Sequence, residues 1–290
     1  MFQGSIVAIV TPFLNGAVDE EKLRELVEFQ ITNGTDAIVP CGTTGEASTL
    51  DYDEHMNVIK IVIEQVNKRV PVIAGTGSNA TAEAIELSQK AKEAGANGVL
   101  LVTPYYNKPT QEGLVRHYTA IADAVAIPQI LYNVPGRTGV NMLPDTVARL
   151  SKHSNIVAIK EATGSLQQAS EVLALCGDNI TVLSGDDFIT FPMMACGAKG
   201  VISVLANIMP KAVADLTDAF FAGDMEKARQ LHLKTLKISN AMFLESNPIP
   251  VKTALGYMRK CKDEVLLPLC PMGEANKERL AMIMKEYDLI

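Results

Sequence analysis

Short apolar runs and amphipathic stretches alternate along the chain as far as about residue 223. The apolar runs, among them 5–13, 70–79 and 97–106, are rich in β-branched residues and apolar on both faces, which is typical of parallel strands covered by helices. The stretches between them have the period of an amphipathic helix. There are eight such strand–helix pairs, the number that closes a (β/α)8 TIM barrel. We therefore predict an α/β fold in which residues 1–223 form a catalytic barrel.

The last part of the chain follows a different pattern. Residues 224–290 contain three helix-like stretches and no apolar run typical of a strand. We therefore predict that residues 224–290 form a small C-terminal helical domain attached to the barrel.

Charge and composition argue against several classes of protein. The net charge of −7 does not suit a nucleic-acid-binding protein, which needs a basic face. No apolar run approaches the roughly 18 residues of a membrane span, and the first residues do not resemble a signal peptide. The five cysteines form no C-x-x-C pair and the four histidines have no metal-ligand spacing. We predict a reduced, cytoplasmic chain with no metal site and no nucleic-acid or membrane partner.

Polar residues follow the predicted strands at their carboxyl ends, where a TIM barrel carries its active site. They are mostly hydroxyl-bearing residues and glycines with one lysine: Thr11, Thr43, Thr44, Gly75, Thr76, Thr103, Tyr105, Tyr106, Tyr132, Asn133, Lys160, Glu161, Ser184, Gly185, Asp186 and Ser203. This set favours proton relay and carbonyl chemistry over metal-assisted hydrolysis.

Lys160 stands at the end of the apolar run 156–159, in the segment NIVAIKEATG. Burial in an apolar mouth disfavours the ammonium form, and the free amine can attack a ketone to form a Schiff base. The alternative is a lysine that extends its charge to solvent or pairs with Glu161. Neighbouring strand residues point to opposite faces, so Glu161 is not expected to share the barrel interior with Lys160. The residue pattern alone leaves both interpretations open.

Two more residues at the predicted mouth suit carbonyl chemistry. Tyr132 ends the strand next to that of Lys160, and its phenol can move a proton to and from a carbinolamine, with Thr43 as the next group. A rim tyrosine that only packs its ring is the alternative. Arg137, in NVPGRTG, can bind a substrate carboxylate through its guanidinium, although an exposed loop arginine fits the same pattern.

The segment GTGSNA (75–80) follows a predicted strand, opens a predicted helix and matches the dinucleotide-binding pattern G-x-G-x-x-G/A. A dinucleotide site also needs an acidic residue at the end of the next strand, and that strand ends in Tyr105 and Tyr106. An NAD-dependent oxidoreductase is therefore a disfavoured alternative.

Several longer motifs extend over nearly the whole chain: GTTGE (42–46), GTGSNATAEA (75–84), TPYYNKPTQEGL (103–114), ILYNVPGRTG (130–139), IKEATG (159–164), LSGDD (183–187), GVISV (200–204) and NPIPVK (247–252). Together they resemble the 4-hydroxy-tetrahydrodipicolinate synthase family of class I pyruvate aldolases. The resemblance implies condensation of pyruvate with L-aspartate 4-semialdehyde, without a cofactor. The product would be 4-hydroxy-tetrahydrodipicolinate, in the diaminopimelate route of lysine biosynthesis.

The resemblance also implies roles for individual residues. Lys160 would form the Schiff base with pyruvate, and Tyr132 would donate and accept protons. Thr43 and Tyr106 would complete the relay, with Tyr106 reaching in from a neighbouring subunit of a homotetramer built as a dimer of dimers. Substrate would be held by Thr44 and the backbone around Ile202, which bind pyruvate, and by Arg137, which guides the semialdehyde carboxylate.

Many members of this family are inhibited by L-lysine at an interface between subunits. The positions that match that site are Ser48, Leu50, His55, Asn79, Glu83 and Tyr105. Tyr105 is adjacent to Tyr106, which offers a route from effector to catalysis. Tyr52 stands where some inhibited relatives have histidine, so the strength of inhibition is left open.

Two further alternatives remain. A related aldolase that cleaves a keto-sugar acid would share the lysine and tyrosine, but such enzymes typically have serine in place of Thr43 and lack the arginine of GRTG. A catalytically silent binding barrel is disfavoured because Lys160, Tyr132, Thr43 and Arg137 are all present.

Overall fold

Eight parallel strands form a barrel in the computed structural model, which describes residues 2–290. Their order is β4-β1-β10-β9-β8-β7-β6-β5, and an Ile38–Val72 bridge joins the two ends of the sheet. The strands are β1 (Gly4–Ala8), β4 (Ala37–Val39), β5 (Ile73–Gly75), β6 (Gly98–Val102), β7 (Gln129–Asn133), β8 (Ile156–Glu161), β9 (Thr181–Ser184) and β10 (Gly200–Ser203). The predicted TIM barrel is confirmed.

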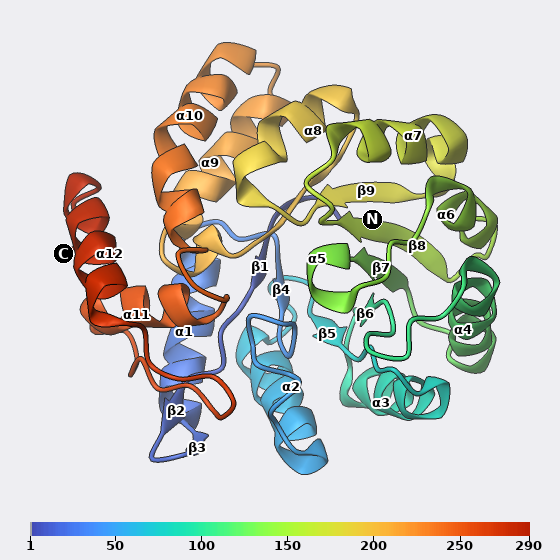
Figure 1. Cartoon of the computed structure of the whole chain (residues 1–290), viewed down its shortest axis with the longest axis horizontal. Helices are drawn as coiled ribbons and strands as arrows, with labels where there is room; N and C mark the ends of the chain where they lie inside the picture. Colours follow the sequence, from blue (N-terminus) through green and yellow to red (C-terminus); the bar gives the residue numbers. More distant parts are fainter. Residues whose placement is uncertain (1) are drawn as a thin grey trace.

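A ring of helices surrounds the barrel (Figure 1). The amphipathic stretches between the predicted strands are helices, and turns and caps take up the residues that flank them. The ring consists of α1 (Glu20–Thr32), α2 (Tyr52–Val66), α3 (Thr81–Ala94), α4 (Gln111–Ala124), α6 (Pro144–Leu150), α7 (Leu166–Cys176), α8 (Thr190–Cys196) and α9 (Pro210–Phe221). Three 3-10 turns, η1 (Gly177–Asn179), η2 (Asp187–Ile189) and η3 (Leu205–Asn207), complete the connections.

Three helices follow the barrel, as expected: α10 (Met225–Ala241), α11 (Ile249–Tyr257) and α12 (Glu274–Glu286). They lie outside the ring on the side of α9 and α1 (Figure 1). Three short elements were not predicted, namely the hairpin of β2 (Phe13–Leu14) with β3 (Ala17–Val18), and α5 (Pro135–Thr138), which lies over the barrel in Figure 1. Within residues 2–290 no helix has the length and apolar content that crossing a membrane would require.

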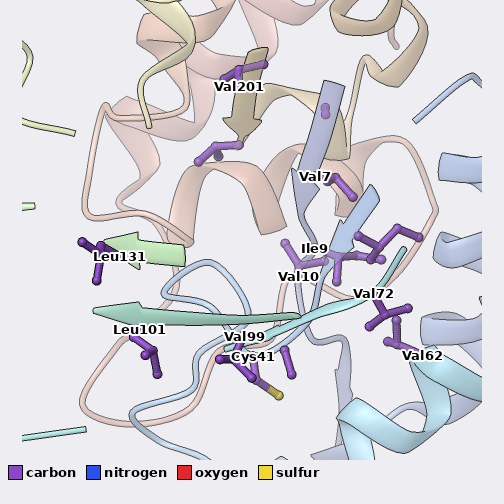
Figure 2. Close-up of a cluster of buried hydrophobic side chains, with 14 of the residues drawn as sticks. Val7, Ile9, Val10, Cys41, Val62, Val72, Val99, Leu101, Leu131 and Val201 are labelled. Carbon is purple, nitrogen blue, oxygen red and sulfur yellow. The ribbon is translucent and has the colours of Figure 1, made fainter. Parts of the chain in front are cut away.

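The core has two layers because strand residues alternate between faces. An inner layer fills the barrel and includes Ile6, Leu100 and Ile130, with Phe2 buried beside them. The outer layer lies between strands and helices. Figure 2 shows part of this layer, where Leu101 and Leu131 project from neighbouring strands. Burial on both faces explains why the strands read as continuous apolar runs rather than as alternating ones.

Local signals fix where the helices begin and end. Asp51 and Glu54 form a capping box at the start of α2, in which each side chain accepts a hydrogen bond from the other residue's backbone N–H. Gly95 ends α3 with a φ of 102°, a left-handed conformation that favours glycine. The start of α2 ends the loop that follows β4 at the carboxyl face of the barrel, and the end of α3 leads into β6 at the amino face.

Candidate active site

Tyr132 on β7 and Lys160 on β8 are paired in the strand register. Both side chains are buried, with 6% and 5% of their surface exposed. The Lys160 Nζ atom lies 4.3 Å from the centre of the Tyr132 ring. Tyr132 belongs to the inner layer, and the residue paired with Lys160 on the other side, Leu183, belongs to it too. The lysine is therefore inside the barrel rather than extended to solvent.

Glu161 points to the outer face, as the alternation along a strand predicts. Its carboxylate accepts hydrogen bonds from Asn133 Nδ2 at 3.2 Å and from the Thr163 backbone N–H at 2.8 Å. Burial raises the pKa of this carboxyl above its ordinary value. The alternative in which Lys160 is the partner of Glu161 is therefore wrong.

Two aspartates at the end of β9 lie near the lysine. Burial raises the pKa of Asp186 to about 6, although the charge of Lys160 acts in the opposite direction. Asp187 is buried and accepts hydrogen bonds from Ser203 Oγ at 2.5 Å and from the backbone N–H groups of Val204 and Leu205 at 3.0 and 2.9 Å. Asp187 therefore fixes the turn that follows β10. Strand β10 carries Ile202, whose side chain lies in the barrel interior.

A cavity of about 390 Å³ opens at the carboxyl ends of β4 to β7. Its volume is in the range of small-molecule sites. The predicted residues that line it come from both proposed sites: Thr43, Tyr132, Arg137, Ser48, Leu50, His55, Glu83 and Tyr105. Lys160 does not line this cavity, but the Tyr132 ring does and is in contact with the lysine.

Arg137 is exposed, and it lies on the short helix α5 rather than in a loop. Its Nη2 donates a hydrogen bond of 3.0 Å to the backbone oxygen of Asn247. The Asn247 side chain donates through Nδ2 to Thr44 Oγ1 at 2.9 Å. One residue of the C-terminal segment thus connects both predicted substrate-binding residues. Asn247 is not among the site residues predicted from the sequence, where its place in the motif NPIPVK is its only signal.

The residues matched to the lysine site have mixed environments. His55 is buried, its Nε2 lies 2.7 Å from the Gly75 backbone oxygen, and burial lowers its pKa. Ser78 donates a hydrogen bond to the Glu83 carboxylate. Asn79 does not line the cavity, but its Nδ2 donates to the Tyr105 backbone oxygen at 3.0 Å.

Tyr106 is the predicted site residue that stands apart. Its side chain is 90% exposed, and its φ of 65° is unusual for a residue with a side chain. A ring with this exposure makes few contacts within its own chain. Within a single chain, Tyr106 is therefore not buried against Thr43 or Tyr132.

The glycines of GTGSNA have a packing role. A Cβ atom on Gly75 would lie 2.0 Å from the Cys41 backbone oxygen, and one on Gly77 would lie 2.4 Å from the Val102 backbone nitrogen. Both glycines therefore permit close approach of neighbouring barrel segments. The closed barrel also differs from the open, doubly wound sheet that binds dinucleotides, so the NAD interpretation is wrong.

The model of the Dihydrodipicolinate synthetase family matches residues 1–287. The chain belongs to this family. It is 89% identical, over the full length of both chains, to a 4-hydroxy-tetrahydrodipicolinate synthase of Geobacter sulfurreducens. The Acinetobacter baumannii dihydrodipicolinate synthase, solved in complex with pyruvate, is 51% identical over both full chains, with a TM-score of 0.98. A Cyanidioschyzon merolae DHDPS solved with lysine bound is 38% identical over 100% of this chain and 99% of that one, with a TM-score of 0.96.

Among the described residues 2–290, no three His, Cys, Asp or Glu side chains form a group that could hold a metal ion. In this member of the Dihydrodipicolinate synthetase family, the groups that the described residues bring to the mouth include an amine, a phenol and hydroxyl groups.

Proposed function

We propose that this chain condenses pyruvate with L-aspartate 4-semialdehyde through a Schiff base on Lys160. The product is 4-hydroxy-tetrahydrodipicolinate, in the diaminopimelate route of lysine biosynthesis. The observation that carries the proposal is a buried lysine beside a tyrosine, inside the barrel at the edge of a cavity. The names of relatives that are nearly identical over the whole chain support the choice of substrates.

Lys160 is the nucleophile in this proposal. Its free amine attacks the keto carbon of pyruvate, and the carbinolamine loses water to give an imine. The imine draws electrons from the methyl group, which loses a proton to form an enamine. The enamine carbon then attacks the aldehyde carbon of the semialdehyde. The amino group of the semialdehyde finally attacks the imine carbon, closes the ring and releases Lys160.

Tyr132 moves the protons of these steps. Its ring contacts Lys160, and it lines the cavity together with Thr43, the next group in the relay. Tyr106 completes the relay from a neighbouring subunit, a role that its 90% exposure in the single chain supports. The active unit is then at least a dimer, and we propose a homotetramer assembled as a dimer of dimers.

The remaining groups hold substrate. Thr44 and the backbone around Ile202 bind pyruvate, and the Arg137 guanidinium binds the semialdehyde carboxylate. Asn247 is hydrogen-bonded to both Thr44 and Arg137, which supports the assignment of these two residues to one substrate-binding site. Neither a cofactor nor a metal has a step in the proposal.

L-lysine is proposed as an effector that binds in the same cavity. Ser48, Leu50, His55 and Glu83 line this cavity, and the Asn79 side chain donates a hydrogen bond to the Tyr105 backbone oxygen. The lysine-bound relative supports this assignment. We also propose a cytoplasmic location, and a division into the barrel (1–223) and a helical domain (224–290), a boundary that falls between the end of α9 and the start of α10.

A direct assay of acceptor aldehydes tests the function. Purified protein is supplied with pyruvate and either L-aspartate 4-semialdehyde or N-acetylmannosamine, and pyruvate consumption is followed. The proposal predicts consumption only with the semialdehyde. Consumption only with the sugar would indicate a sialate-type aldolase instead.

A further inference from the structure

Behind the catalytic pair lies a second pair of residues on the outer face of the barrel. Asn133 follows Tyr132 on β7 and Glu161 follows Lys160 on β8, and the two are matched in the strand register. Asn133 is 0% exposed and Glu161 is 1% exposed. Asn133 Nδ2 donates to Glu161 Oε2 at 3.2 Å. This side-chain bond joins the two strands at the level of the catalytic residues.

Each member of the outer pair is also held by the backbone of a loop. The Met142 N–H donates to Asn133 Oδ1 at 2.9 Å, and the Thr163 N–H donates to Glu161 Oε1 at 2.8 Å. Asn141 Oδ1 accepts a second hydrogen bond from Asn133 Nδ2 at 2.9 Å. The outer pair is therefore anchored to its own strands and to the loops beyond them.

Burial of this network needs a reason, because a buried carboxylate is costly to maintain. Burial raises the pKa of Glu161, while hydrogen bonds from Asn133 and Thr163 act in the opposite direction. An apolar pair at the same positions, like Leu131 and Ile159 two register positions earlier on the same face, would pack the outer layer without that cost. A directed hydrogen bond adds what apolar contact lacks, which is a fixed relative position of the two strand ends.

We propose that Asn133 and Glu161 are positioning residues that hold Tyr132 and Lys160 side by side at the strand ends. The inference deepens the proposed function, since it concerns the same Schiff-base lysine. Displacing one strand end by about 1 Å is enough to lower a reaction rate by about 100-fold. Loss of the outer pair should therefore slow imine formation without altering the groups that react.

The test uses a reversal of the pair in the full-length protein. Glu161→Gln and Asn133→Asp are each nearly isosteric, but they leave two amides or two carboxylates facing one another. The double variant Asn133→Asp/Glu161→Gln restores one amide and one carboxylate in reversed order. Thr217→Val is the matched control, because it removes a buried hydrogen bond outside the mouth, Thr217 Oγ1 to the Ala214 backbone oxygen at 2.9 Å, on helix α9.

Two rates are measured on folded protein. The first is formation of the borohydride-trapped pyruvate adduct, and the second is reductive methylation of Lys160 by formaldehyde and cyanoborohydride. We expect each single variant to form the adduct about 10- to 100-fold more slowly. The double variant should be faster than either single variant, and Thr217→Val should match the wild type. Methylation of Lys160 should differ from wild type in the single variants and return toward it in the double variant.

The inference would be overturned if the folded single variants had a lower melting temperature but unchanged adduct and methylation rates. The pair would then have a structural role only. If neither single variant folds, Asn141→Leu leaves the Asn133–Glu161 bond in place and removes one acceptor of Asn133 together with the two bonds between Asn141 and Gln168. It should give a smaller loss of rate, and no loss would count against the inference. A wild-type protein that forms no pyruvate adduct would contradict the proposed function. The methylation rates would then still decide whether the pair positions Lys160.

Discussion

The Lys252 ammonium and the Glu46 carboxylate form a hydrogen-bonded ion pair of 2.7 Å in which both side chains are fully buried. Lys252 also donates to the Thr11 backbone oxygen at 2.9 Å, and Glu46 accepts from the Leu266 N–H at 2.9 Å. Burial lowers the pKa of Lys252, while the charge of Glu46 acts in the opposite direction. The pair joins helix α11 to the turn that carries Thr43 and Thr44.

Removing one member of this pair should destabilise the fold strongly. Lys252→Met leaves an uncompensated buried carboxylate, which costs about 3–5 kcal/mol of unfolding free energy. Urea denaturation measures the loss. The control Lys211→Met removes an exposed pair with Asp215 and should cost no more than about 1 kcal/mol. Equal effects of the two substitutions would contradict the structural role of the buried pair.

Arg137→Ala should separate the two substrates. The variant loses the guanidinium proposed to bind the semialdehyde carboxylate, so the KM for the semialdehyde should rise by about 10-fold or more. The borohydride-trapped adduct with pyruvate should form at the wild-type rate, because Lys160 and Tyr132 are untouched. Steady-state kinetics and mass spectrometry check the two statements. A matching loss in adduct formation would place Arg137 in pyruvate binding instead.

Tyr106 should act across a subunit interface. Tyr106→Phe should lower turnover by at least about 10-fold, because a group of the proton relay is lost. Mixed oligomers of Tyr106→Phe and Lys160→Ala should regain activity, since one of their sites combines an intact Lys160 with an intact Tyr106 from the partner. Activity is assayed after the two proteins are unfolded and refolded together. A mixture no more active than the sum of its parts would show that the tyrosine acts within its own chain.

Asp186 should make stability depend on pH. Its pKa is raised from 3.8 to about 6 in the folded protein. The contribution of Asp186 to the free energy of unfolding is therefore fully favourable below about pH 4, and this contribution is lost as the pH rises through about 6. Asp186→Asn should accordingly be more stable than wild type at pH 7.5, by on the order of 2 kcal/mol, and show little difference near pH 4. Urea denaturation at the two pH values checks this; a difference that is the same at both would contradict it.

Most of the fold could be predicted from the sequence because its signals are long and periodic. Apolar strands of five or six residues, such as Gln129–Asn133 and Ile156–Glu161, are bounded by clear turns. The hairpin of Phe13–Leu14 with Ala17–Val18 was missed because strands of two residues contain no period. Helix α5 was missed because PGRT, with its proline and glycine, is typical of a turn.

The candidate site was predicted in part for a similar reason. Lys160 was recognisable as a cation that follows an apolar strand, and the alternation rule gave its direction correctly. Asn247 was missed because its partners Arg137 and Thr44 are 110 and 203 positions away in the sequence. The buried pair Lys252–Glu46 was missed because charged residues are ordinarily assigned to the surface. Only the closed barrel brings these groups together.

The most direct test of the account is to reduce the protein with borohydride in the presence and absence of pyruvate and to map the modified peptide. The account predicts one covalent pyruvate adduct per chain, located on Lys160 and missing from a Lys160→Ala variant. An adduct on another lysine, or none on a protein that consumes pyruvate and semialdehyde, would contradict it.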